Sequence, residues 1–131
     1  MNKPLVYLAG PYSKGDVAQN VYNALRLADY IVQTGEAVPY VPHLTHFWHM
    51  MFPQPYEWWL EYDLIWLEKC DALIRIAGES GGADKEVVFA NKKDLPCFLL
   101  KGYELQSLSE LDRWLCTLKP IDKDRQSKNA E

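Results

Sequence analysis

The chain has 131 residues, of which 48% are hydrophobic and 24% are charged, and its formal net charge is −4 at pH 7. This length favours one domain with a sizeable core and excludes two. The negative charge argues against binding a nucleic-acid polymer through its phosphates, and no apolar run approaches the roughly 20 residues of a membrane span. Because no signal-peptide pattern precedes the first predicted strand, we expect a cytoplasmic protein.

The first half of the chain alternates between predicted strands and helices. Leu5–Ala9 is a short apolar run that ends at a Gly-Pro pair, which is typical of a buried strand. A helix is predicted next, with Asp16 as its cap and Gly35 as its end. A second strand is expected at Ala37–Val41, followed by a long loop over residues 42–55. A loop of that length in a small domain is more often functional than idle.

The second half continues the alternation. A helix is predicted over Tyr56–Cys70, then a strand over Asp71–Ile76 and a helix that contains Glu86. Leu95–Leu100 is the fourth strand, and the last helix spans about 107–118. Together these elements fill the chain up to residue 118.

Four strands separated by helices predict a doubly wound α/β fold, which is a Rossmann- or flavodoxin-like three-layer sandwich with a parallel sheet of four or five strands. Residues 1–118 form this single domain, and the charged residues 119–131 are expected to be a disordered tail. In such folds ligands bind beyond the carboxyl ends of the strands, where the loops after the first two strands and residues 80–86 meet.

Two of these connections have the composition of a nucleotide-binding rim. The loop 10–16, Gly-Pro-Tyr-Ser-Lys-Gly-Asp, offers a hydroxyl and a lysine to a phosphate, although it lacks the Walker pattern and an ordinary turn explains its Gly and Pro equally well. Residues 80–86 place Glu86 on the predicted first turn of a helix, where the helix dipole favours a charged carboxylate. Glu86 is therefore a candidate nucleophile, or else a glutamate that only satisfies the dipole.

Three separated segments resemble one known family. Residues 6–13, 58–72 and 80–86 are similar in order and spacing to the nucleoside 2-deoxyribosyltransferase superfamily, which includes deoxyribosyltransferases and deoxynucleoside 5′-monophosphate N-glycosidases. The resemblance covers about residues 5–100. It implies the fold predicted above and an enzyme that breaks an N-glycosidic bond without a cofactor.

The resemblance also implies roles for individual residues. Glu86 matches the nucleophile, Asp63 the acid that exchanges a proton with the departing base, and Tyr7 the hydroxyl that orients the nucleophile. The implied substrate-binding residues are Gly10, Pro11, Ser13, Lys14, His43, Trp59, Ser80 and Gly82. The turn after Gly10 differs from the Ser-Ile-Arg-Gly-Gly type of the monophosphate hydrolases, which leaves a preference for a 5′-phosphate open.

The implied chemistry needs two carboxyl groups in different charge states. Breaking the bond builds positive charge on the sugar and negative charge on the base, so one acid acts as a carboxylate and the other as a proton donor. We expect burial among Trp59, Tyr62 and Trp66 to raise the pKa of Asp63. A sugar ester on Glu86 is then released to water or to a second base. The predicted reaction is hydrolysis of a nucleoside or (deoxy)nucleoside 5′-monophosphate, with base transfer or a nucleotide sensor without turnover as the alternatives.

The segment 42–66 carries two further patterns. His43, His46 and His49 recur every third residue, but this spacing lacks the frame of a zinc site, and contact of His43 with base or sugar is the better hypothesis. The aromatic residues are Phe47, Trp48, Phe52, Tyr56 and Trp58. They form either a wall that stacks a nucleobase or an interface, and the resemblance implies a homodimer or a higher homo-oligomer.

The three cysteines, Cys70, Cys97 and Cys116, are odd in number and lie in apolar segments. Reduced thiols in the core fit this pattern better than disulfides or metal ligands do.

Overall fold

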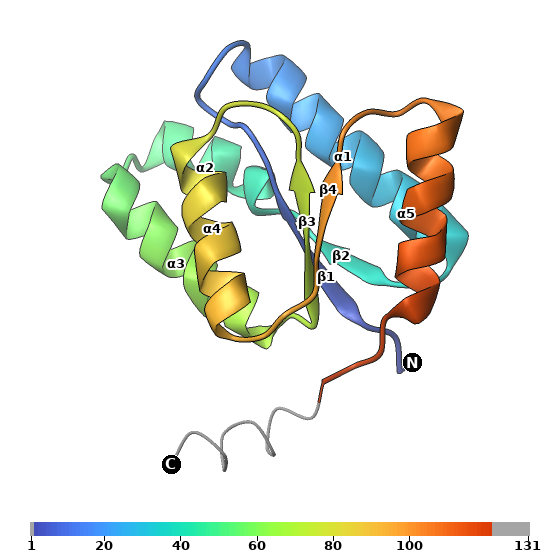
Figure 1. Ribbon diagram of the computed structural model, residues 1–131. Coiled ribbons are helices and arrows are strands. Elements are labelled where there is room, and N and C mark those ends of the chain that lie inside the picture. Colours follow the sequence, from blue (N-terminus) through green and yellow to red (C-terminus); the bar gives the residue numbers. More distant parts are fainter. Residues whose placement is uncertain (1, 122–131) are drawn as a thin grey trace, which may run out of the picture.

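One parallel sheet organises the chain. The computed structural model describes residues 2–121, and within them four strands pair in the order β2-β1-β3-β4 (Figure 1). The strands are β1 Leu5–Ala9, β2 Val38–Tyr40, β3 Ala72–Ile76 and β4 Cys97–Leu100. All three strand pairs are parallel. The predicted α/β fold class, a doubly wound three-layer sandwich, is confirmed, with four strands in the sheet.

Helices cover both faces of this sheet. They are α1 Val17–Thr34, α2 His46–Met51, α3 Tyr56–Lys69, α4 Gly81–Lys92 and α5 Leu105–Thr117, and a 3₁₀ turn, η1, spans Pro42–Thr45. Figure 1 shows α1 and α5 together on one side of the strands and α3 and α4 on the other. Among residues 2–121, no helix is long and apolar enough to cross a membrane.

Helix α1 shows how local sequence sets the boundaries. The side chain of Asp16 accepts a hydrogen bond from the amide of Gln19 at 3.2 Å, which satisfies a donor that the helix leaves free. Gly35 ends the helix in the left-handed conformation with φ of 74°, and its amide donates to the carbonyl of Val32. Both ends agree with the sequence prediction.

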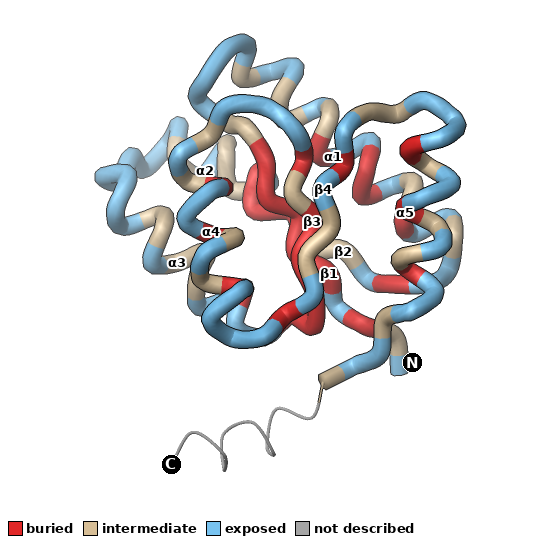
Figure 2. The backbone as a smooth tube through the Cα atoms, viewed as in Figure 1, coloured by how far each residue is buried: buried red, intermediate tan, exposed pale blue. Residues whose placement is uncertain are grey.

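The strand alternation divides the core into two clusters. On one face, Val6, Leu8 and Ile74 pack with the apolar side chains of α1 and α5. On the other, Tyr7 and Leu73 pack with residues of α3 and α4. Figure 2 shows the central strands as the most buried part of the molecule. Because successive residues of a strand point to opposite faces, β1 supplies both clusters.

The structure corrects three expectations. Residues 42–51 form η1 and α2 instead of a continuous loop. Cys70 is buried as expected, but Cys97 is half-buried and Cys116 is exposed, so the expectation of a core thiol is wrong for Cys116. The amide of Ile121 donates to Asp71 at 2.7 Å, so Ile121, which the sequence assigned to the tail, is attached to the domain. The prediction for residues 122–131 lies outside the described residues.

Candidate functional site

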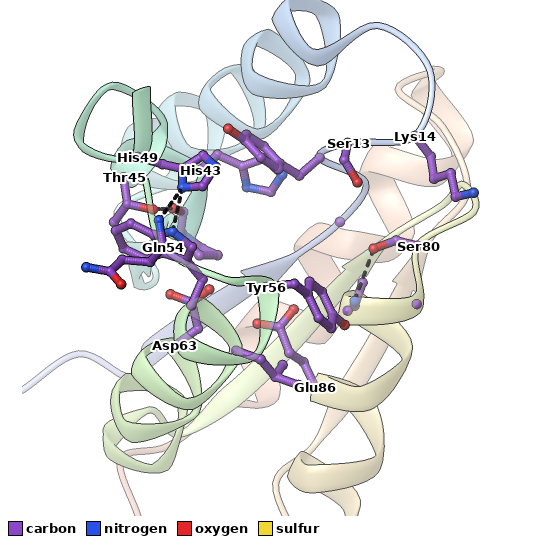
Figure 3. A pocket seen from close by; sticks show the side chains of 18 residues that line it. Ser13, Lys14, His43, Thr45, His49, Gln54, Tyr56, Asp63, Ser80 and Glu86 are labelled. Carbon is purple, nitrogen blue, oxygen red and sulfur yellow. Dashed lines mark hydrogen bonds between the residues drawn. The ribbon is translucent and has the colours of Figure 1, made fainter. Parts of the chain in front are cut away.

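A cavity of about 450 Å³ opens at the carboxyl ends of β1 and β3 (Figure 3). It lies where the chain leaves β1 for one edge of the sheet and β3 for the other, the place where such folds bind ligands. Its walls come from the loop after β1, from η1 and α2, from α3, and from the start of α4. It is lined by Gly10, Tyr12, Ser13, Lys14, Pro42, His43, Thr45, His49, Gln54, Tyr56, Trp59, Leu60, Asp63, Ser80, Gly81, Gly82, Ala83 and Glu86.

Glu86 lies in the floor of this cavity, one turn later in the helix than the sequence predicts. Ser80 is the cap of α4, and its hydroxyl accepts a hydrogen bond from the amide of Ala83 at 3.1 Å. The acid of the first turn is consequently Asp84, and Glu86 sits on the second turn with 6% of its surface exposed. The expectation that the helix dipole holds Glu86 ionised is therefore wrong, because the effect fades within the first turn.

Tyr7 is the partner of Glu86. It projects from the middle of β1 toward α4, is fully buried, and donates its hydroxyl hydrogen to Oε2 of Glu86. Burial and the nearby acids raise the pKa of Tyr7, so it stays a neutral donor. Tyr7 does not line the cavity itself, and it contacts Glu86 from the sheet.

Asp63 is the second acid of the cavity. It projects from the third turn of α3, and Figure 3 shows its carboxyl group and that of Glu86 pointing into the same space. Burial raises the pKa of Asp63 to about 7, in the direction that the sequence predicts. Its Oδ1 is buried and has no hydrogen-bond partner among the described residues.

The two acids differ in what stabilises their charge. Burial also raises the pKa of Glu86, to about 8, and the charge of Asp63 raises it further, whereas the Tyr7 hydrogen bond and the Arg75 charge lower it. An ionised Asp63 would bury a charged oxygen without a donor, which costs more than leaving a neutral group unpaired. The order of the two pKa values alone would leave the proton on Glu86. Glu86 has a hydrogen-bond donor in Tyr7 whereas Asp63 Oδ1 has none, and on this ground we assign the negative charge of the reactive form to Glu86 and the proton to Asp63. The pair titrates as a unit because each charge affects the other.

Arg75 is a residue of the site that the sequence prediction missed. Its guanidinium group lies under the start of α4, where it donates to the carbonyl of Gly78 and pairs with Asp84, both at 2.9 Å. Only 13% of the Arg75 side chain is exposed, against 72% for Asp84. A charged residue inside a buried strand was the available signal, since such charges are rarely buried without a task.

The loop after β1 forms one end of the cavity. Gly10, Ser13 and Lys14 line it as predicted, and the Asn20 amide fixes the loop by donating to the carbonyls of Tyr12 and Lys14 at 2.9 and 2.8 Å. Pro11 does not line the cavity. Its ring packs against Gly78, where an added Cβ would come within 2.6 Å of it, so the structure does not place this predicted substrate-binding residue in the cavity wall.

Of the remaining predicted positions, Trp59, Ser80 and Gly82 line the cavity. Gly82 lies close to the hydroxyl of Tyr56, which an added Cβ would approach to 3.3 Å. Tyr56 thus reaches from α3 over the start of α4, and its ring forms part of the wall beside Glu86 (Figure 3). The roles of Trp59, Ser80 and Gly82 in binding a substrate stay predictions.

The other four aromatic side chains of the predicted base-stacking wall lie outside the cavity. Phe47, Trp48, Phe52 and Trp58 do not line it, and their exposed fractions run from 37% to 72%. Trp48 and Trp58 contact Trp59 and Tyr62 in an aromatic cluster on α2 and α3. The hypothesis that these four side chains stack a nucleobase is therefore wrong for the single chain.

The three histidines occupy different parts of the site. His43 and His49 line the cavity, and each of the three has its own hydrogen-bond partner. Residues 2–121 contain no group of three His, Cys, Asp or Glu side chains placed to hold a metal ion.

Several cavity residues were not predicted individually. They are Tyr12, Pro42, Thr45, His49, Gln54, Leu60, Gly81 and Ala83. All but Leu60 lie in the three connections that the sequence singled out, residues 10–16, 42–55 and 80–86. The available signal was the place of these connections after strands and, for 42–55, its length.

Comparisons with known proteins give a family but no activity. Residues 4–99 match the family described as Domain of unknown function (DUF7768), and this range contains the whole cavity. No curated protein matches the chain.

Proposed function

The chain belongs to the DUF7768 family, and from its cavity we propose that it breaks the N-glycosidic bond of a nucleoside or a (deoxy)nucleoside 5′-monophosphate, with Glu86 as the nucleophile. The observation that carries this function is the buried Glu86, which accepts a hydrogen bond from Tyr7 and shares one cavity with the unpartnered acid Asp63. The similarity of residues 6–13, 58–72 and 80–86 to the nucleoside 2-deoxyribosyltransferase superfamily supports the same choice of bond.

The two acids divide the reaction between them. An oxygen of Glu86 attacks C1′ of the sugar, the bond from C1′ to the base nitrogen breaks, and Asp63 gives its proton to the departing base. Water then attacks C1′ of the sugar ester and passes a proton to Asp63, which restores both acids. Tyr7 keeps the attacking carboxylate in place by its hydrogen bond.

The arrangement of the cavity gives the substrate a direction. Figure 3 shows Ser13, Lys14 and Ser80 toward one end, Asp63 toward the other, and Glu86 between them. The first end offers an ammonium group, hydroxyls and the start of α4, all of which favour an anion. The sugar then lies over Glu86 with its 5′ substituent near Lys14 and its base near Asp63 and Trp59.

Incubation with a panel of nucleosides and nucleotides, with and without a second free base, tests the function directly. Chromatography is expected to show release of base in the absence of an acceptor. Exchange that requires an acceptor base would identify a deoxyribosyltransferase instead. Tight binding without either reaction would identify a nucleotide sensor, and no binding at all would remove the proposed substrate class.

Other expectations belong to the same proposal. The reaction needs no cofactor, because two carboxyl groups and water complete it, and the substrate is a small molecule of the cytoplasmic nucleotide pool. The protein is a homodimer or a higher homo-oligomer, because α2 and its neighbours expose a run of large apolar side chains that water solvates poorly. These are Leu44, Phe47, Trp48, Met50, Met51 and Phe52. Sedimentation of the protein with Phe47→Glu and Met51→Glu is expected to show dissociation.

A further inference from the structure

The three regularly spaced histidines have no part in the chemistry proposed above, yet each makes a hydrogen bond to another wall of the cavity. His43 and His46 contact the loop after β1, and His49 contacts α3. All three lie on residues 42–51, which form the wall between those two elements. Because the three histidines are spaced by three residues over η1 and α2, the imidazole rings of His43 and His46 face the loop after β1 and the ring of His49 faces α3.

The first contact fixes the loop that carries Ser13 and Lys14. His43 is 6% exposed, and its Nε2 lies 2.9 Å from the carbonyl oxygen of Pro11. A carbonyl only accepts, so Nε2 carries the hydrogen and donates it. The ring of Tyr12 meets the rings of His43 and His46 edge-on, and its hydroxyl is hydrogen-bonded to Nδ1 of His46. Two consecutive loop residues are therefore attached to residues 42–51.

The contact of His49 fixes the wall formed by α3. Nδ1 of His49 accepts a hydrogen bond from the indole N–H of Trp59 at 2.7 Å, and the backbone N–H of Gln54 donates to the same nitrogen at 3.4 Å (Figure 3). An indole N–H only donates, so Nδ1 carries no hydrogen and the neutral ring has its hydrogen on Nε2. The plane of Trp59 is thereby set at the end of the cavity that holds Asp63.

We propose that His43, His46 and His49 are positioning residues that form a brace, which holds residues 42–51 between the loop after β1 and helix α3. Without the brace, the wall 42–51 would be joined to its neighbours mainly by packing. With it, the end that holds Lys14 and the end that holds Trp59 keep a fixed separation, which is the dimension that a bound nucleotide must match.

The brace makes a prediction about hydrogen positions that does not depend on any substrate. In nitrogen-15 NMR spectra of the full chain at pH 8, His43 and His49 are expected as the tautomers with hydrogen on Nε2. The indole N–H resonance of Trp59, assigned with Trp59→Phe, is expected to exchange slowly with water. An Nδ1–H tautomer at His49, or an indole N–H that exchanges as fast as that of a surface tryptophan, would overturn the brace.

Amide substitutions separate the hydrogen bonds from mere bulk, because the asparagine amide lies about where Nδ1 of histidine lies and the glutamine amide about where Nε2 lies. His49→Asn is expected to keep an acceptor for Trp59, and His49→Gln to lose it. At position 43 the order reverses, since the contact uses Nε2, so His43→Gln keeps the donor to Pro11 and His43→Asn loses it. Slow exchange of the Trp59 indole N–H in His49→Asn but not in His49→Gln is the expected result.

The same Asn and Gln variants at positions 43 and 49 can be compared by enzyme kinetics, a test that rests on the proposed function. With the nucleoside or 5′-monophosphate that the panel identifies as substrate, His49→Gln and His43→Asn are expected to raise KM about fivefold with little change in kcat, as loss of one hydrogen bond in the ground state predicts. His49→Asn and His43→Gln recover most of this loss. Equal KM values for the two amides at each position would overturn the brace. Absence of turnover in the unsubstituted protein would instead remove the proposed function, and the NMR comparison would still decide on the brace.

Discussion

The two faces of the sheet bury different kinds of side chain. The cluster under α1 and α5 is built from aliphatic residues such as Leu27, Ile31 and Leu111. The face under α3 and α4 buries Tyr7 and Glu86 in addition to its apolar residues. The comparison indicates that one face supplies stability, whereas the other gives up part of its apolar core to hold ionisable groups close to a cavity.

The largest effect is expected from the acid in the floor of the cavity. Glu86→Gln keeps the shape of the side chain and an acceptor for Tyr7 but removes the nucleophilic charge, so kcat for base release should fall at least about a thousandfold. Glu79, an exposed glutamate just before α4, is the matched control, and Glu79→Gln should retain turnover. Full activity in Glu86→Gln would reject the mechanism.

Substitutions in the core under α1 and α5 should change the free energy of unfolding without changing the pH dependence of turnover. Leu27 is fully buried, and Leu27→Ala should lower the free energy of unfolding by about 2 to 5 kcal/mol, measured by urea titration. Leu25 on the same helix is 39% exposed, so Leu25→Ala should cost much less. In both variants the pH optimum of turnover should stay in place. A shifted optimum in Leu27→Ala would contradict the separation of the two faces.

The two acids on the face under α3 and α4, Glu86 and Asp63, should make the free energy of unfolding fall as the pH rises. Burial raises the pKa of Glu86 from 4.5 to about 8 and that of Asp63 from 3.8 to about 7 in the folded protein. The folded state thus binds more protons than the unfolded state between about pH 4 and pH 8, and each unit of separation corresponds to about 1.4 kcal/mol. Urea titrations should show this loss, with a smaller slope for Glu86→Gln. Equal slopes in the two proteins would contradict the assigned burial.

The smallest effect concerns the charge next to Glu86. Arg75 lowers the pKa of Glu86, so Arg75→Gln should move the acidic limb of the pH profile of kcat upward by roughly half a unit. Asp84→Asn removes the counter-ion of Arg75 and should move this limb downward by less, because Asp84 is mostly exposed. Shifts in the same direction would show that Arg75 acts only as a structural support for the loop.

Sequence patterns predicted the regular part of this molecule well. The strand Leu5–Ala9 and the caps of α1 at Asp16 and Gly35 are local features, in which apolar runs and special residues mark the ends of an element. The fold class follows from the alternation of such elements. The predicted positions Gly10, Lys14 and several others line the cavity because parallel strands bring their carboxyl-terminal loops together.

The rest depends on contacts that no local pattern contains. Helix α2 has six residues, no side-chain cap and no buried residue, so it lacks an amphipathic signature. The hydrogen bond from Tyr7 to Glu86 joins residues 79 positions apart. Burial, which has the largest effect on the pKa of Glu86, likewise arises only when α4 packs on the sheet. A prediction based on the helix dipole alone could not include this effect.

The most direct measurement is to search for the sugar on Glu86 itself. The protein would be mixed with the substrate whose base the panel shows to be released, quenched in acid within the first turnover, digested and analysed by mass spectrometry. A peptide that contains Glu86 and carries the mass of the sugar or sugar phosphate is the predicted result, and it should be absent from Glu86→Gln. Base release with the sugar on another residue would contradict Glu86 as the nucleophile, and so would a peptide that stays unmodified throughout turnover under conditions that preserve an ester.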